Sequence, residues 1–200
     1  MMDSWPAAVE RLARELGRLP GVGRRSAVRL THHLLRCPQD EAMALAEALA
    51  LARQHVQPCD RCGNYAQDSL CPICQDPRRD PALVCIVEKP SDIGSFEATG
   101  RFQGVYHVLG ALLSPLDGLG PVEMGAERLR ERLGDGTVKE LVLAVPASTE
   151  GEATSLYIAR MAHAAGIQVT RLARGLPAGG GIEYSDALTV LQAFEGRIPA

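Results

Sequence analysis

The chain has few aromatic residues, no long apolar run and no excess of positive charge. Aromatic side chains make up 4% of the 200 residues, too few for the long stacking surfaces on which some proteins hold unpaired bases. No apolar run approaches the ~20 residues of a membrane-crossing helix, and the N-terminus lacks a signal-peptide pattern. A net charge of −3 argues against a uniformly basic nucleic-acid binder. The composition is that of a soluble globular protein with no membrane partner.

The charge is distributed unevenly along the chain. Residues 1–36 contain seven arginines and three acidic residues, a net charge of +4, which leaves −7 for the other 164 residues. This asymmetry indicates that an anionic partner meets the N-terminal segment.

Four of the six cysteines form two closely spaced pairs, Cys59 with Cys62 and Cys71 with Cys74, each separated by two residues. Each pair can bind a metal ion from a tight turn, and the four thiolates together match a tetrahedral structural zinc site. The alternative is two disulfides or four idle thiols, which the paired spacing disfavours. Four thiolates leave no open position for substrate, and they fit a reducing compartment. We therefore predict an architectural zinc site in a cytoplasmic protein.

A glycine-rich turn, LPGVG, joins two segments of helical periodicity. Gly21 and Gly23 let the backbone adopt positive φ and approach a ligand closely. The N-terminus of the next helix then presents N–H groups and a positive dipole to a phosphate, whatever the base sequence. Arg24, Arg25 and Arg29 flank the turn, and the last two share one helix face. These five residues form a candidate DNA-binding site; the alternative is a plain interhelical turn with solvated arginines.

The pattern changes at Ala82. Two short, continuous apolar runs, typical of strands buried on both faces, follow in the second half of the chain at 83–87 and 140–145, and a third strand is predicted at 167–172, after Gly166. Helical periodicity between the last two segments, from 152 to 165, indicates β-α-β connections. Residues 82–175 should therefore form a small, mostly parallel sheet flanked by helices.

Three glutamates follow the predicted strands. Glu88 comes directly after the first, and Glu150 and Glu152 follow the second, at the start of a predicted helix. Ligands of parallel sheets gather at the carboxyl ends of the strands, so these carboxylates could converge and hold Mg²⁺, which prefers oxygen ligands. The alternative is that Glu150 and Glu152 only favour a helix N-terminus, with Glu88 solvated.

In this order the motifs resemble those of the RecR family of bacterial recombination mediators, over essentially the whole chain. The LPGVG turn with Ser26-Ala27 is similar to the family's helix-hairpin-helix motif, and the four cysteines are similar to its zinc finger. The stretches 83–88 and 148–154 resemble its Toprim domain. Three further stretches carry the same resemblance: Tyr106–Leu109, Leu113–Pro121, and Gly175–Gly180 with Glu183-Tyr184.

Pattern and resemblance together predict an α+β multidomain chain. Its four predicted parts are a helical helix-hairpin-helix module (1–56), a four-cysteine zinc finger (57–78), an α/β Toprim domain with a mostly parallel sheet (79–175) and a C-terminal segment (176–200).

The resemblance also implies a function. RecR-like proteins act with RecO, and with RecF at gap junctions, to load RecA on gapped single-stranded DNA. They form dimers and ring-shaped tetramers that can encircle DNA. Their Toprim part contacts partners and has no catalytic activity, so Glu88, Glu150 and Glu152 are expected to meet RecO or RecF.

Two departures bear on this expectation. Catalytic Toprim enzymes carry Asp-x-Asp where this chain has Glu150-Gly-Glu152, which weakens an enzymatic interpretation. Many family members carry Asn-Pro-Thr where this chain has Pro146-Ala-Ser148, which leaves the conformation of that loop open. The alternative function is a Toprim-type, metal-dependent nuclease or primase.

Overall fold

The computed structural model describes residues 5–198. The chain divides into two compact units, Met1–Val56 and Gln57–Ala200. The first is helical, and the second contains both sheets and the remaining helices, which agrees with the expected α+β class. Within the described residues, no helix combines the length and the apolar character needed to cross a membrane.

The N-terminal unit consists of three helices, α1 (Ala7–Leu16), α2 (Arg24–Arg36) and α3 (Gln39–His55). α1 and α2 pack against each other. Gly17, which ends α1, lies against α2, because a Cβ added there would lie 3.6 Å from the Cβ of the buried Ala27, which is ordinary van der Waals contact. Thr31 is also buried, and its hydroxyl donates a 2.9 Å hydrogen bond to the Ala27 carbonyl.

Residues 57–75 form a small module that opens the second unit. Two short strands, β1 (Gln57–Pro58) and β2 (Tyr65–Ala66), pair antiparallel, and a single-turn helix, α4 (Pro72–Gln75), follows. The buried cluster of this module contains the four cysteines and Ala66, with Leu70 and Ile73 packed against it. So small an apolar cluster needs a cross-link or a metal ion to hold a fold.

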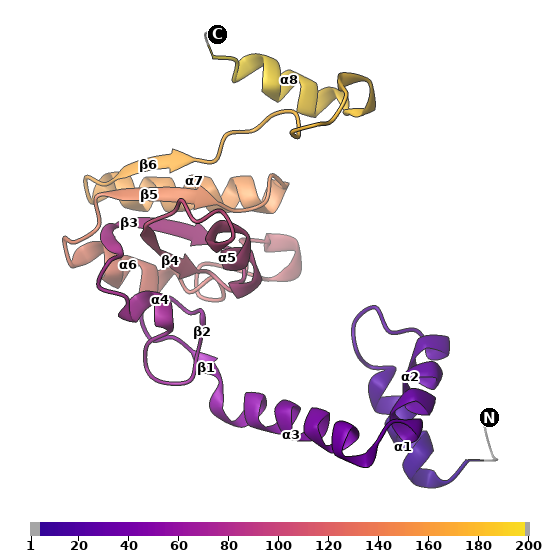
Figure 1. Cartoon of the computed structure of the whole chain (residues 1–200). Coiled ribbons are helices and arrows are strands. Elements are labelled where there is room, and N and C mark those ends of the chain that lie inside the picture. The colour runs from indigo at the N-terminus through magenta and orange to yellow at the C-terminus, as the bar shows by residue number, and fades with distance from the viewer. Residues whose placement is uncertain (1–4, 199–200) are drawn as a thin grey trace. The chain divides into compact units, whose positions relative to one another are not determined.

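The main sheet has four parallel strands in the order β4-β3-β5-β6, which confirms the predicted parallel sheet (Figure 1). The strands are β3 (Asp80–Val87), β4 (Gly104–Val108), β5 (Glu140–Ala144) and β6 (Gln168–Arg171). The chain leaves β3 towards one side to form β4 and then returns past β3 to form β5. The carboxyl ends of β3 and β5 therefore mark the topological switch point, where open parallel sheets bind ligands.

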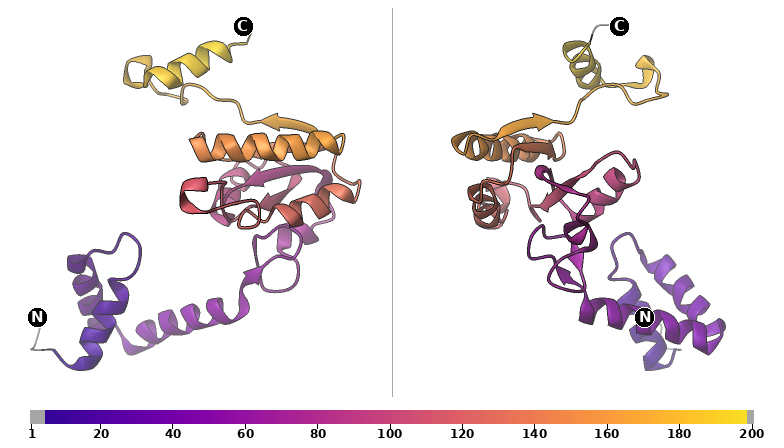
Figure 2. Two further views of the ribbon diagram at one scale, coloured as in Figure 1. Left: turned by 180° about the vertical axis from the view of Figure 1, so that it is seen from behind. Right: turned by 60° about the vertical axis from the view of Figure 1, so that its left-hand side comes forward.

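Three helices flank the sheet: α5 (Pro90–Glu97), α6 (Ala126–Gly134) and α7 (Thr149–Ala164). Leu129 of α6 and Ile158 of α7 join Ile86 of β3 in one buried cluster. Ile93 of α5 packs with Val87 in another. The helices α6 and α7 thus cover one face and α5 the other, as the views in Figure 2 also show.

The chain end follows β6 and contains a 3₁₀ turn, η2 (Ile182–Tyr184), and the helix α8 (Ala187–Glu195). A second 3₁₀ turn, η1 (Pro115–Asp117), lies between β4 and α6. The three predicted strands are present with slightly shifted ends, whereas β4, α5 and α6 had not been predicted. α7 begins at Thr149 and not at residue 152, because Ser148 caps it by accepting a 3.1 Å hydrogen bond from the Gly151 N–H.

Candidate functional site

The four predicted zinc ligands come together at one point. The thiol sulfurs of Cys59, Cys62, Cys71 and Cys74 all lie within 4.8 Å of one another. Those of Cys62 and Cys71 are 3.6 Å apart, close to the roughly 3.8 Å expected between sulfurs that each lie about 2.3 Å from a tetrahedral zinc ion. All four residues are at most 9% exposed. The spacing and burial fit a closed, four-thiolate zinc site.

Backbone N–H groups point at the sulfurs of this site. The Cys71 N–H lies 3.3 Å from the Cys59 sulfur, and the Asn64 N–H lies 3.4 Å from the Cys62 sulfur. Burial raises the pKa of the Cys59 thiol, but the backbone groups of Cys71, Cys62 and Arg61 outweigh that effect and bring it to about 7. These N–H groups favour a thiolate at Cys59, the form that binds zinc, whereas the Cys74 thiol and burial raise the pKa of Cys62, and burial raises that of Cys71. A bound zinc ion here would supply the cross-link that the small apolar cluster lacks.

The LPGVG turn has the conformation that its glycines predict. The Val22 N–H donates to the Leu19 carbonyl (3.0 Å), which closes a tight turn. Gly21 has a φ of +78°, the left-handed region that favours glycine, and nothing lies within 4 Å of its open side. Gly23 follows as the N-cap residue of α2 and offers no capping side chain. The start of α2 thus presents free backbone N–H groups to a ligand.

The cations around this helix start are exposed and outnumber the acidic residues. The first turn of α2 contains no acidic residue, and Arg24, Arg25 and Arg29 are all exposed. A hollow of about 480 Å³ between α1 and α2 also places Arg14 beside Arg24, with Trp5 and the carboxylate of Glu10 in its wall. Arg14 had not been predicted as part of this site, because it belongs to the preceding helix. The helix dipole and several guanidinium groups therefore favour an anion at the same place.

The three predicted acidic residues have different surroundings. Glu88 forms an ion pair with its neighbour Lys89 at 2.9 Å. Glu152 forms ion pairs with Arg171 (2.8 Å) and Arg174, which fasten the start of α7 to the segment after β6. Glu150 is partly exposed, and its pKa is lowered by backbone N–H groups at the helix start and by the Ser148 hydroxyl.

Within the described residues, the three carboxylates do not form a group of metal ligands, which favours the alternative to a Mg²⁺ site. Among residues 5–198, the four cysteines are the single group of three or more potential ligands close enough together to hold a metal ion. Glu152 turns instead towards the two arginines of its own chain, a role that sequence spacing did not reveal because the partners lie 19 and 22 residues away.

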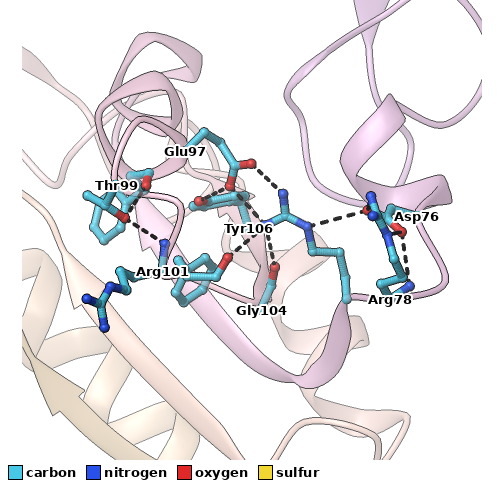
Figure 3. Close-up of polar contacts among 10 residues, drawn as sticks. Asp76, Arg78, Glu97, Thr99, Arg101, Gly104 and Tyr106 are labelled. Carbon is cyan, nitrogen blue, oxygen red and sulfur yellow. Dashed lines mark hydrogen bonds and ion pairs between the residues drawn. The ribbon is translucent and has the colours of Figure 1, made fainter.

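A further polar cluster joins the end of the zinc module to the sheet. Arg79 donates hydrogen bonds to Glu97 Oε1 (2.9 Å) and to the Gly104 carbonyl (3.3 Å), and its Nε lies 4.0 Å from Asp76. The Tyr106 hydroxyl donates to the same Glu97 oxygen (2.5 Å), and Figure 3 shows Glu97, Gly104 and Tyr106 converging. The Arg79 hydrogen bond lowers the pKa of Glu97.

Comparisons with known proteins agree with this arrangement. Four family models match in chain order: the RecR helix-hairpin-helix (9–53), the RecR four-cysteine zinc finger domain (56–76), the Toprim domain (82–173) and the RecR C-terminal region (175–198). Recombination protein RecR of Streptomyces avermitilis is 49% identical over 193 residues, which is 96% of this chain and 97% of that protein. The chain belongs to the RecR family.

Other RecR proteins are similar over equally long stretches. That of Rubrobacter xylanophilus is 47% identical over 196 residues, 98% of each chain, and that of Leifsonia xyli is 48% identical over 189 residues, 94% of this chain and 96% of the other. The RecR zinc-finger model covers all four cysteines, and the RecR helix-hairpin-helix model covers the glycine turn with its arginines. The predicted family, fold class and zinc-binding cofactor site are thereby confirmed.

Proposed function

We propose that this RecR-family chain is a non-enzymatic, DNA-binding mediator of recombinational DNA repair in the cytoplasm. It acts with RecO and RecF to load RecA on gapped single-stranded DNA, and it assembles with itself into dimers or tetrameric rings that encircle DNA. Its four working parts are residues 1–56, 57–78, 79–175 and 176–200. The observation that carries the proposal is the exposed cationic helix start of α2 in a RecR-type hairpin module.

DNA binding rests on backbone phosphates in this proposal. Gly21 and Gly23 place no side chain between the α2 start and a ligand, so a phosphate can approach the free N–H groups directly. Arg25 and Arg29 lie one helical turn apart and can reach phosphates along one strand. Such contacts are independent of base sequence, which suits a protein that acts wherever a gap occurs. Several weak sites in one ring add avidity without new contacts.

The test is the salt dependence of binding to gapped DNA, measured by fluorescence anisotropy on the full-length protein. Replacing Arg25 and Arg29 with alanine should weaken binding to all DNA sequences alike and lower the log–log salt slope by about 1.5. The control replaces Arg11 and Arg53 with alanine, which removes the same charge from the same unit. Arg11 lies in α1 and Arg53 in the last turn of α3, so neither belongs to α2. If both double variants lose the same DNA affinity, the loss comes from net charge alone and this DNA site is refuted.

Partner binding is assigned to the acidic residues at the switch point. Glu88 and Glu150 flank the carboxyl ends of β3 and β5, and Glu152 stands beside them with its two arginines. A basic patch on RecO or RecF would meet this edge, and complementary charge would speed association and make it sensitive to salt. Charge reversal at Glu150 tests this contact by binding kinetics. The Glu150 side chain forms no ion pair with another described residue, so the change breaks no such contact within the chain.

The competing function is a Toprim-type, metal-dependent nuclease or primase. It needs carboxylates free to hold a divalent cation, and Glu152 is instead held by Arg171 and Arg174. Incubation with gapped DNA, nucleotides and Mg²⁺ or Mn²⁺ decides between them. Cleavage or primer synthesis that Glu152→Gln abolishes would establish the enzyme and overturn the mediator assignment.

A further inference from the structure

The zinc module is joined directly to one edge of the parallel sheet. β4 is an edge strand, because the order is β4-β3-β5-β6. Its Val108 N–H donates a 2.7 Å hydrogen bond to the carbonyl of Cys62, one of the four zinc ligands. Ile73, between the zinc ligands Cys71 and Cys74, also packs against the apolar cluster beneath α5. The metal-binding loops therefore cover an edge that would otherwise be unpaired.

Two arginines of α6 lie in the seam between that module and the sheet. Arg128 donates to the Val108 carbonyl at 2.6 Å, and Arg132 donates to the Tyr106 carbonyl at 2.6 Å. The Arg128 guanidinium also lies against Gly63, the residue after Cys62, since a Cβ added at Gly63 would sit 2.8 Å from one of its nitrogens. Any side chain at position 63 would displace this arginine.

Arg132 reaches the same loops from the next turn of α6. A polar hollow of about 90 Å³ places it beside Arg61, which lies between the first two zinc ligands. Burial lowers the pKa of Arg132, while the Cys74 and Cys62 thiolates act in the opposite direction. Two neighbouring charges also affect the pKa of Arg132: Arg61 lowers it and Asp135 raises it.

These two cations have no ion-paired carboxylate within the described part of the chain. The hydrogen bonds that their guanidinium groups make there go to neutral carbonyls, and the Arg128 Nε, although buried, has no partner. His107, the buried titratable side chain beside them, is uncharged, because burial and the two arginines lower its pKa to about 3. Partly buried cations are costly unless an opposite charge lies nearby.

The zinc site supplies that opposite charge. Four thiolates around one Zn²⁺ carry a net charge of −2, and the two arginines carry +2. We propose that Arg128 and Arg132 balance the charge of the tetrathiolate zinc centre, and that they are positioning residues which fasten the metal site to the sheet and strengthen zinc binding. Zinc binding and docking of the module then stabilise each other, because the zinc-bound thiolates and the two arginines attract each other across the seam.

The test compares zinc binding in full-length variants by competition with a chromogenic chelator. Arg132→Met removes the charge while keeping apolar bulk. It should weaken zinc binding by about 10–100-fold, the usual effect of mutating a residue that supports metal ligands from behind. Arg132→Lys keeps the charge and should retain most of the affinity. The matched control is Arg130→Met on the same helix, where the arginine is half exposed and pairs with Glu127; it should bind zinc like the parent.

A second measurement separates charge balance from ordinary packing. Urea unfolding of the zinc-loaded and metal-free forms should show a larger loss of stability in the zinc-loaded form of Arg132→Met. Equal losses in both forms, or equal zinc affinities for the methionine and lysine variants, would overturn the proposal and leave Arg132 a packing residue. Arg128→Met with Arg128→Lys provides the same comparison if Arg132→Met does not fold.

Discussion

Gly151 stands in the first turn of α7, in the middle of the Glu-Gly-Glu motif, and its replacement by alanine gives the sharpest test of the local packing. A Cβ at this position would lie 1.9 Å from the carbonyl oxygen of Pro146 and 2.9 Å from its carbon. The atoms would have to separate by about 1.5 Å to reach ordinary van der Waals contact. Both partners are backbone, so the start of α7 itself must move.

The expected change in the free energy of unfolding combines one stabilising effect with two destabilising ones. Alanine in place of glycine stabilises a helix by roughly 1 kcal/mol. Overpacking against fixed backbone costs about 1–3 kcal/mol. Displacement of the helix start also breaks the bond from the Gly151 N–H to the Ser148 hydroxyl, a cap worth about 1 kcal/mol. The net prediction is that Gly151→Ala destabilises the chain by roughly 1–3 kcal/mol.

Gly94→Ala is the matched control, because Gly94 lies inside α5 and nothing is within 4 Å of its added Cβ. It should stabilise the chain by about 0.5–1 kcal/mol. Urea unfolding followed by far-ultraviolet ellipticity, at saturating zinc, measures both variants, and hydrogen exchange of the α7 amides locates the effect. If Gly151→Ala proves as stable as Gly94→Ala, the close approach of α7 to Pro146 is refuted.

Three further outcomes are expected. Cys62→Ser should bind well under one zinc per chain by metal analysis and fold poorly, because the module lacks its own core; full folding without zinc would contradict this. Glu97, whose pKa is lowered chiefly by the Arg79 hydrogen bond, contributes stability that is complete above the ordinary pKa of 4.5 and is lost as the pH falls through its lower folded value. The free energy of unfolding, measured in urea from pH 7 down to about pH 3, should therefore depend less on pH in Glu97→Gln than in the parent. An unchanged pH profile would show that this carboxylate does not contribute to stability. Glu152→Lys should loosen the segment after β6, seen as faster hydrogen exchange there, and slow RecO binding, while zinc content and DNA affinity stay unchanged; unaltered exchange would mean that its two ion pairs with arginines do not hold that segment.

The zinc ligands and the hairpin turn could be predicted because their chemistry is local. The spacing of Cys59 with Cys62 and of Cys71 with Cys74 already restricts the geometry of each pair, and the structure brings the pairs together. The positive φ of Gly21 likewise follows from the turn sequence, since few other residues adopt it. Continuous apolar runs predicted β3 and β5, because a strand covered on both faces carries mainly apolar side chains. The third predicted strand, β6, followed from its place after a helical segment that ends at Gly166.

The fourth strand was missed because its burial depends on distant contacts. β4 contains His107, a polar residue that looks unsuited to a core, yet its five residues are all buried. Gly104, which opens the strand, lies so near the Leu83 carbonyl that an added Cβ would be 2.4 Å away. Only the pairing of β4 with β3, across an intervening helix, creates that environment. No pattern inside a five-residue segment reports such a neighbour.

The sequence by itself determined the family, the zinc ligands, the cationic hairpin and the parallel sheet, since each depends on residues close together in the chain. Tertiary structure alone decided how charges are paired. Glu152 meets Arg171 and Arg174, and Arg128 and Arg132 lie beside the zinc-binding loops. Charged side chains carry no periodic signal of their partners, because an ion pair joins whichever groups the folded elements bring within a few ångströms.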